Sequence, residues 1–536
     1  MRTTLSLFIL IFFSLIAASQ NETRHWYFGN KAGLDFTTSP PTLVNNSSMH
    51  VSEGCSTVSD TSGNLLFYTG GDTIWNKNHQ VMANGAGLFG DGSSSQSCII
   101  VKQPGNAGIY YVFTVQGGVG SAGVYYSVVD MSLAAGMGSV TVKNSPIAGP
   151  SEEKITAIKH CNGKDYWIVT TFNNFYQTYF QVFSSYLLSS TGVTTLAATS
   201  IATVQGGFRS APKGSLKGSP DGKRLGLATS YASGKAFYLM DFDNTTGQVS
   251  NPLSLGYPAG YGCEFSSDGK KIYATFPWAA GMIVQWDLSI PTSSAVVASE
   301  TVIGTFNYIG AMQLASDGKI YLATNQHSLL VINNPNALGA ACNLTVSNLS
   351  FPPGGLQLGL PNFPADYFWN GSSLAITTNN SLTLCKGQTK TLTVAGANSY
   401  SWNIGGTSPT VAVSPTITTS YSVVGTTTAG CVYKGYATVT VNNCTGFSDF
   451  ENGGMTMRLF PNPANDYLQL EFSNGDENSF KKWSIFNQLG QLVGDQNISL
   501  TDHNKIELVD LPEGVYSLVL KSDDSRTLSK RFVISR

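Results

Sequence analysis

Paired carboxylates are the residues of this sequence that could do chemistry. Two acidic side chains held a few ångströms apart can act as proton donor and proton acceptor, as they do in glycan-cleaving enzymes. The residues that could form such a pair are Glu53, Asp72, Glu152 and Glu264. They lie far apart in the sequence, so they could meet only across the centre of a fold that surrounds them. The alternative, in which each carboxylate accepts hydrogen bonds in a turn or a cap, stays open.

The sequence contains no other catalytic or metal-binding pattern. Its six histidines show no His-x-x-x-His spacing and its cysteines no Cys-x-x-Cys spacing, so a structural zinc site has no support. The histidines are His25, His50, His79, His160, His327 and His503. There is also no Gly-x-Ser-x-Gly elbow, P-loop or EF-hand loop. We therefore predict no catalytic, cofactor-binding or metal-binding residue from motifs.

The elements that must position these side chains are β-strands. Short apolar runs such as Tyr110–Phe113 and Tyr166–Val169 lie between clusters of Gly, Asn and Asp, which is typical of strands and turns. The chain has 536 residues, of which 42% are hydrophobic, and this excludes a disordered protein. It carries 30 Lys and Arg against 32 Asp and Glu, so its charge gives no reason to expect nucleic acid as a partner. The composition favours an all-β protein of several domains.

The first 19 residues have the pattern of a secretory signal peptide. Arg2 supplies the positive charge, Leu5–Ile16 is an apolar run, and small residues precede a cleavage site between Ser19 and Gln20. A bilayer-spanning helix needs about 20 apolar residues, so this run is too short to remain as an anchor. No second run of that length follows, and we expect an exported protein with no transmembrane segment.

A turn followed by an apolar strand recurs six times in residues 20–369. The glycines of these turns are 45, 55, 59, 47 and 49 positions apart. They are Gly63, Gly108, Gly163, Gly222, Gly269 and Gly318. A period near 50 fits the four-stranded blade of a β-propeller, and the length of the region allows about seven blades. A row of stacked sandwiches is the alternative.

The ends of this region must build the blade that lacks the turn. The candidate strands are His25–Phe36 at the front and Leu356–Phe368 at the back. Pairing the first and last strands in one blade closes the ring and hides its edges.

Several segments of residues 20–369 resemble known propellers. Ser219-Pro220-Asp221-Gly222-Lys223 resembles the turn of YVTN- and WD40-like repeats. The segments Trp26–Phe36, Glu53–Asp60 and Gly359–Phe363 are similar to surface proteins associated with gliding motility. The resemblance implies a propeller on the cell surface. It implies no catalytic residues.

Residues 370–445 contain few charges and many Thr, Ser, Val and Gly. Trp402 lies between Cys385 and Cys431, as in the core of an immunoglobulin-like sandwich, and a Cys385–Cys431 disulfide would stabilise so small a module. The region resembles the Ig-like or PKD-like spacers of bacterial surface proteins. The pairing of the remaining cysteines stays open: Cys55, Cys98, Cys161, Cys263, Cys342 and Cys444.

The segment 457–536 carries the most specific motifs. Leu459-Phe460-Pro461-Asn462-Pro463-Ala464 comes before a strand, two glycine-containing segments follow, and a basic strand ends the chain. The motif residues are Pro461, Asn462, Pro463, Gly490, Gly514, Tyr516, Lys530 and Arg531. They resemble the type A C-terminal sorting domain of the type IX secretion system. We expect a small seven-stranded sandwich in which Gly490 and Gly514 form turns, with Asn487 in place of the aspartate common before the first turn.

The sorting-domain resemblance implies an export route and partners. The partners would be the type IX secretion machinery and a sortase-like protease that cuts in the linker, expected at 446–456 within Thr445–Thr456. The protein would be secreted, either on the outer-membrane surface or outside the cell. With no catalytic motif, we expect a binding or adhesion protein whose propeller takes an extracellular glycan or protein ligand. An extracellular lyase or hydrolase acting on polysaccharide is the alternative, because propellers host both roles.

Overall fold

The computed structural model describes residues 18–536 with several internal gaps. The gaps are 118–122, 150, 174–179, 195–197, 204–212, 231–235, 370–373, 375, 378–381, 387, 429, 443–455, 474–479, 498–504 and 523–526. The expected signal peptide up to residue 17, the linker up to residue 455 and Cys444 lie outside the described residues. In the described part of the chain, no helix is both long and apolar enough to cross a membrane.

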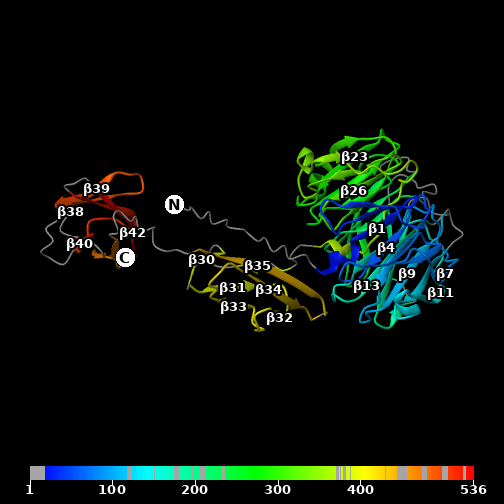
Figure 1. The fold of residues 1–536 in the computed structure, drawn as a ribbon, viewed down its shortest axis with the longest axis horizontal. Coiled ribbons are helices and arrows are strands. Elements are labelled where there is room, and N and C mark those ends of the chain that lie inside the picture. Colours follow the sequence, from blue (N-terminus) through cyan, green and yellow to red (C-terminus); the bar gives the residue numbers. More distant parts are fainter. Residues whose placement is uncertain are drawn as a thin grey trace, which may run out of the picture. The chain divides into compact units, whose positions relative to one another are not determined.

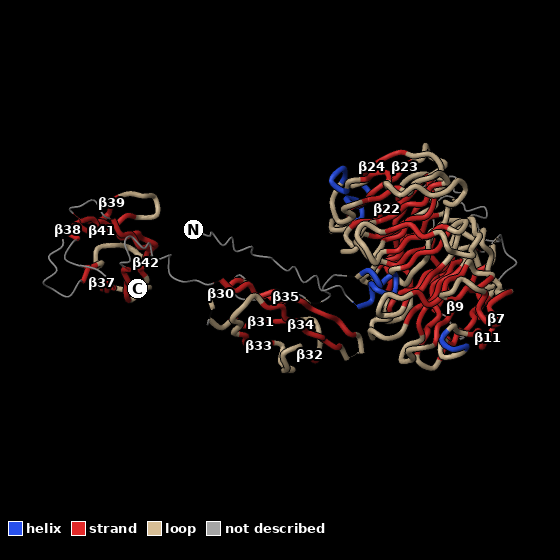
Figure 2. The backbone as a smooth tube through the Cα atoms, viewed as in Figure 1, coloured by secondary structure: helices blue, strands red, loops and turns tan. Residues whose placement is uncertain are grey.

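The chain forms two compact units, and the division between them passes through the middle module. One unit contains residues up to 375 with 394–409 and 422–436, and the other contains 376–393, 410–421 and 437–536. Nearly all described elements are β-strands (Figures 1 and 2). The all-β fold predicted from the sequence is therefore confirmed.

The first three repeats of the propeller form antiparallel sheets in which the first strand is the innermost. The first sheet contains β4 (Ser56–Ser59), β5 (Leu65–Thr69), β6 (Thr73–Asn76) and β7 (Val81–Ala86). The second contains β8 (Cys98–Lys102), β9 (Ile109–Val115), β10 (Val124–Asp130) and β11 (Ser139–Ala148), with helix η2 (Ala134–Gly136). The third contains β12 (Ile155–Lys159), β13 (Tyr166–Asn173), β14 (Phe180–Ser189), β15 (Gly192–Val193) and β16 (Ala198–Thr203). A single parallel pair, Ser139 with Ala83, joins the outer strands of the first two sheets.

The next three repeats have the same antiparallel order. The fourth sheet contains β17 (Leu216–Gly218), β18 (Arg224–Ala228), β19 (Phe237–Asp243) and β20 (Gln248–Leu255). The fifth contains β21 (Cys263–Phe265), β22 (Lys271–Phe276), β23 (Met282–Asp287) and β24 (Thr301–Thr305), with helix α1 (Ser293–Ala298). The sixth contains β25 (Ile309–Leu314), β26 (Ile320–Thr324), β27 (Leu330–Ile332) and β28 (Leu344–Val346), with helix η3 (Gly339–Cys342). Because each sheet packs against a neighbour on both faces, strands such as β22 and β26 are buried along their whole length.

The repeated glycines lie in the turn between the first and second strands of each sheet. Five of the six have positive φ, between +67° and +91°, which residues other than glycine rarely adopt. Gly108 is the exception, since its φ is not in that range. The period seen in the sequence therefore marks one structural turn per blade.

The two ends of the region build the seventh unit. Helix η1 (Ala18–Thr23) leads into β1 (His25–Phe28), β2 (Ala32–Asp35) and β3 (Thr42–Val44). The segment that follows β28 passes between β25 and the residues before β4. The Leu358 N–H donates to the Ser52 carbonyl, and the Leu358 carbonyl accepts from the Ala311 N–H. The Trp26 ring joins both ends, with ring centroids 6.0 Å from Phe363 and 5.7 Å from Tyr321.

One part of this closure differs from the expectation. Leu356–Phe368 is not a regular strand, since it makes an isolated bridge at Pro361 and then the helix η4 (Ala365–Phe368). Pro361 and Pro364 lack the N–H groups that a continuous ladder requires.

The middle module has two sheets. The first contains β29 (Ile376–Thr377), β31 (Lys390–Val394) and β33 (Thr410–Val413), and the second β30 (Thr383–Cys385), β35 (Val432–Asn442), β34 (Thr419–Thr426) and β32 (Ser399–Trp402). Trp402 is buried, as the sequence predicts, and its Nε1–H donates to the Ser408 carbonyl at 2.9 Å.

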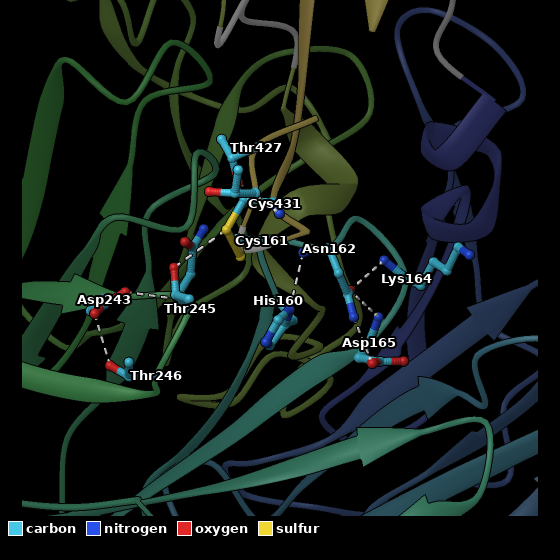
Figure 3. Close-up of a disulfide and its surroundings, with 12 residues drawn as sticks. His160, Cys161, Asn162, Lys164, Asp165, Asp243, Thr245, Thr246, Thr427 and Cys431 are labelled. Atoms are coloured by element: carbon cyan, nitrogen blue, oxygen red, sulfur yellow. Dashed lines mark hydrogen bonds between the residues drawn. A yellow bond between two sulfur atoms is a disulfide. The ribbon is translucent and has the colours of Figure 1, made fainter. Parts of the chain in front are cut away.

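The disulfide predicted for this module is wrong. Cys431 pairs with Cys161 in the turn between β12 and β13, and their Cα atoms are 4.6 Å apart (Figure 3). Cys385 is aligned with Asn442 at the far end of β35, whereas Cys431 directly precedes the first residue of that strand. Eleven strand residues extend over about 33 Å, so Cys385 and Cys431 cannot reach each other.

The last module is the small sandwich expected from its sequence. Seven described strands form sheets of three and four: β36 (Thr456–Phe460), β37 (Tyr467–Ser473) and β40 (Lys505–Glu507), then β39 (Leu492–Asn497), β38 (Phe480–Phe486), β41 (Gly514–Ser522) and β42 (Thr527–Ile534). Gly490 forms a turn with positive φ, in which Asn487 Oδ1 accepts from Leu489 and Gln491 as an aspartate would. Gly514 does not form a turn, because it begins β41 and pairs with Ile534.

Candidate functional site

The inner strands of the propeller begin very close together around its axis. A Cβ atom on Gly359 would overlap the carbonyl oxygen of Glu53, and one on Gly310 would overlap that of Leu358. Only glycine permits backbones to approach so closely. The residues that lie two or three positions before each inner strand are therefore brought together at one end of the axis, which we call the mouth.

Two carboxylates meet at the mouth through one serine. The Ser95 hydroxyl lies 3.1 Å from Glu153 Oε2 and 3.4 Å from Glu53 Oε2, and the Ser95 N–H also donates to Glu153 at 3.1 Å. The Ser95 hydroxyl in turn accepts from Gly214 N–H at 3.0 Å. Glu53 and Glu153 are 6% and 3% exposed, so the pair lies almost completely buried at the base of the mouth. We call this base the floor.

The environment of Glu53 favours its protonated form. Burial raises its pKa to about 7, and the negative charge of Glu153 adds to this effect. The exposed Lys213, the Tyr261 hydroxyl and the Ser95 hydroxyl act in the opposite direction. At pH 7 the Glu53 carboxyl is therefore about half protonated.

Tyr261 completes the floor. Its side chain is 2% exposed, and its hydroxyl lies close enough to Glu53 to lower the pKa of that carboxyl. Among the described residues, however, this hydroxyl has no hydrogen-bond partner of good geometry. Burial and the charge of Glu53 raise the pKa of Tyr261 well above its usual value, so the hydroxyl keeps its proton.

An exposed aromatic ring borders this floor. Trp278 lies in the loop between β22 and β23, is 57% exposed, and meets the Tyr261 ring edge-on with centroids 6.1 Å apart. The mouth thus combines an aromatic rim with a polar floor. Its residues, as the term is used below, are Glu53, Ser95, Glu153, Lys213, Tyr261 and Trp278.

Deeper along the axis, the propeller is filled by a polar network. Lys217 Nζ donates to Gln313 at 2.6 Å, and lies 3.4 Å from both Glu264 and Asn362. Asn362 crosses to the third sheet, where its Nδ2 donates to the Ile155 carbonyl at 2.9 Å. In these contacts the polar side chains serve as hydrogen-bonding and ionic partners for one another, which indicates that the network stabilises the fold.

The structure contains an acid pair, but one of its two residues is not among the four candidates proposed from the sequence. Of the four candidates only Glu53 reaches the mouth, and its partner there, Glu153, was not among them. Glu152 forms a buried ion pair with Lys154 at 2.9 Å, Glu264 faces Lys217, and Asp72 is exposed in the loop between β5 and β6.

The sequence did contain a signal for Glu153. Glu152, Glu153 and Lys154 directly precede β12, and side chains alternate in direction along an extended segment. Glu152 and Lys154 share one side, so Glu153 points to the other. Glu53 and Glu153 also precede their inner strands by nearly the same number of residues, three and two.

No group of three His, Cys, Asp or Glu side chains suited to a metal ion occurs among the described residues. The arrangement can exchange a proton, accept hydrogen bonds from a ligand and offer an aromatic face.

In the last module, the motif residues hold the chain end in place. Asn462 Oδ1 accepts from Val533 N–H at 2.9 Å, and Lys530 Nζ donates to the Met457 carbonyl at 2.8 Å. Tyr516 donates to the Pro512 carbonyl at 2.7 Å and stacks on Phe532. Pro461 and Pro463 follow β36, and both are preceded by cis peptide bonds.

Comparison with known proteins identifies this last module. Residues 458–535 match the family model of the secretion system C-terminal sorting domain. The protein is accordingly a type IX secretion cargo, carried to the cell surface or outside the cell, and it interacts with the type IX secretion machinery. A search of curated proteins finds no match to the chain.

Solved structures are similar to about three fifths of this chain. Hsv2 of Kluyveromyces lactis is 8% identical with a TM-score of 0.35, covering 61% of this chain and 95% of that chain. Hydrazine synthase of Kuenenia stuttgartiensis is 14% identical with a TM-score of 0.36, covering 61% and 96%. Similarities this low carry no argument about function.

Proposed function

We propose that the protein is a binding protein of the cell surface and that the mouth of the propeller is its ligand face. The observation that carries this proposal is the exposed Trp278 ring beside the polar floor of Glu53 and Tyr261. Binding sites typically combine an apolar or aromatic surface with a few convergent polar groups. The ligand would be an extracellular glycan or protein, because the chain is exported.

The other two modules then serve delivery. The middle module, which we take to be an Ig-like or PKD-like spacer, separates the propeller from the tail along the chain. The sorting domain takes the protein out of the cell and is removed by a sortase-like protease. Neither role requires the propeller to do chemistry.

An extracellular enzyme acting on polysaccharide is the second candidate. It is favoured by the Glu53–Glu153 pair, since a carboxyl with a pKa of about 7 can act as a general acid near neutral pH. Against it, both carboxylates are nearly buried and already share the Ser95 hydroxyl. A general acid must reach the bond that it protonates.

Binding arrays with the secreted protein test the proposal. We expect binding to a glycan or protein that falls at least tenfold in Trp278→Ala. Tyr436→Ala is the matched control, since Tyr436 is 55% exposed but belongs to the middle module. Turnover of a polysaccharide that is lost in both Glu53→Gln and Glu153→Gln would contradict the proposal and favour the enzyme.

A further inference from the structure

The hairpin that joins β38 to β39 in the sorting domain exposes three apolar side chains close together in the sequence. Leu489 is 83% exposed, Leu492 54% and Val493 37%. Leu489 is the most exposed large apolar side chain among the described residues. Apolar side chains that gather at one place on the surface of a soluble domain commonly mark an interaction surface. We call these three residues the apolar tip.

The turn of this hairpin is held in a fixed shape by Asn487. Its Oδ1 accepts hydrogen bonds from the backbone N–H groups of Leu489 and Gln491, each at 3.0 Å. Its Nδ2 donates to Gln491 Oε1 at 2.8 Å, and Gly490 supplies the positive φ that the turn requires. Leu489 is therefore presented by an ordered turn, which lowers the entropic cost of binding a partner.

The strand that follows the turn carries an extra residue. Gly494 pairs with Ile485 and Leu492 pairs with Phe486, so Val493 has no residue opposite it on β38. Such a β-bulge changes the direction of side chains and makes a strand edge a poorer template for a further strand. β39 is an edge strand of its sheet. The apolar tip therefore suits a partner that receives side chains in an apolar pocket better than a partner that adds a strand.

The hairpin also lacks charge, although the module is otherwise rich in it. Of the 86 residues in Glu451–Arg536, 21 are charged, but none of the twelve residues between Lys482 and Asp495 is. Lys482 and Asp495 themselves form an ion pair at 2.6 Å. Depletion of charged residues is typical of the centre of a protein–protein interface. An uncharged, apolar partner surface would match this hairpin.

Three motif residues of the sorting domain act within the module instead. Asn462 Oδ1 accepts a hydrogen bond from Val533 N–H. Lys530 Nζ donates to the Met457 carbonyl, and Tyr516 is only 5% exposed. Because these side chains hold the fold together, the surface that the export machinery contacts has to include residues that the fold leaves outside.

We propose that the apolar tip is the surface by which the sorting domain docks into an apolar pocket of the type IX secretion machinery. The machinery is the partner because the module matches the sorting-domain family, whose role is export. The docking surface lies in the tail module and is separate from the ligand face of the propeller.

Export of the full chain carrying Leu489→Ser and Leu492→Ser tests this assignment. Both side chains are exposed, so the double variant should keep the melting temperature of the unchanged protein. In a host that has the type IX system, its amount outside the cell should fall at least tenfold, and folded protein without its signal peptide should accumulate in the periplasm. Leu489→Ser alone should cause a smaller loss. Normal export of the double variant would overturn the inference.

Val509→Ser is the matched control. Val509 is 60% exposed in the same module, in the loop between β40 and β41, and undergoes the same change from an apolar to a polar side chain. It should be exported normally. An equal loss of export in Val509→Ser would overturn the inference, because export would then depend on the apolar surface of the module in general.

Photo-crosslinking tests the contact itself. With benzoylphenylalanine in place of Leu489, we expect a light-dependent adduct with an outer-membrane component of the type IX system, identified by mass spectrometry. The same group in place of Val509 should give at least tenfold less of this adduct. An adduct formed only with a second copy of this chain or only with lipid would assign the apolar tip to another partner and overturn the inference, as would the absence of any adduct from position 489.

Discussion

Cys161 and Cys431 are joined by a disulfide although 270 positions separate them in the sequence. The same contact includes a backbone hydrogen bond from Val432 N–H to the Cys161 carbonyl at 2.6 Å, and Thr245 Oγ1 lies 3.5 Å from Cys431 Sγ (Figure 3). The bond ties the start of β35 to the β12–β13 turn of the propeller. The middle module is therefore covalently attached at two points, through the chain and through the disulfide.

Cutting the chain after the propeller tests this attachment. With a protease site inserted after Trp369, the cleaved protein should run as one species on a denaturing gel without reductant and as two species with it. Cys161→Ser and Cys431→Ser should each release the fragments without reductant, because no covalent link remains.

The control for this experiment is Cys385→Ser, which removes the cysteine expected from the sequence to pair with Cys431. It should leave the fragments linked. Release of the fragments from the unchanged protein without reductant would contradict the Cys161–Cys431 bond, because a disulfide within the module would not link the two fragments.

The carboxylate pair should make stability depend on pH. The pKa of Glu53 is raised from 4.5 to about 7 in the folded protein, so the folded state binds more protons than the unfolded state between these values. Stability from this group is complete below about pH 4.5 and is lost as the pH rises through about 7. The loss amounts to roughly 3–4 kcal/mol at most, since each pKa unit corresponds to about 1.4 kcal/mol.

Glu53→Gln removes this titration. We expect the melting temperature of the variant, relative to that of the unchanged protein, to rise between pH 5 and pH 8. Asp72→Asn also removes one negative charge, but from an exposed loop, and should show no such trend. Parallel pH profiles for Glu53→Gln and the unchanged protein would contradict the assignment of Glu53.

Repetition made much of the fold predictable from the sequence. The turn glycines, Gly63 to Gly318, recur because each blade repeats one hairpin, and positive φ at five of the six positions enforces glycine. The closure of the propeller by the two ends of residues 20–369 was predictable for a similar reason, since a ring of sheets must leave no exposed strand edge. Its detail was not, because the prolines at 361 and 364 prevent a regular strand.

The contacts that join separate parts of the chain could not be predicted in the same way. The pairing of Cys161 with Cys431 depends on the contact between one turn of the propeller and the start of β35. No local sequence pattern indicates this contact. Glu153 was missed because its neighbours Glu152 and Lys154 form a local ion pair, and only the position relative to the inner strand distinguishes it.

The sorting domain should depend on the packing of its last strand. Phe532 is fully buried in the core of this module and stacks on Tyr516. Phe532→Ala should cost about 3–5 kcal/mol, a large part of the stability of so small a domain. We expect the variant, like a deletion of Lys530–Arg536, to accumulate in the periplasm with its signal peptide removed. Ser529→Ala, at an exposed position of the same strand, should reach the surface normally.

The same module should be sufficient for export. Its core is formed by residues between Met457 and Ile534 alone, including Leu468, Ile485 and Leu518, which indicates that it folds without the propeller. Fusing Glu451–Arg536 to an unrelated folded reporter should therefore bring the reporter to the surface of a host that has the type IX system, and a protease added outside should degrade it there. The fusion carrying Phe532→Ala is the matched control and should stay inside, because an unfolded tail presents no recognition surface. A reporter retained in the periplasm with the intact tail, or exported equally well with Phe532→Ala, would show that recognition requires more than this folded module.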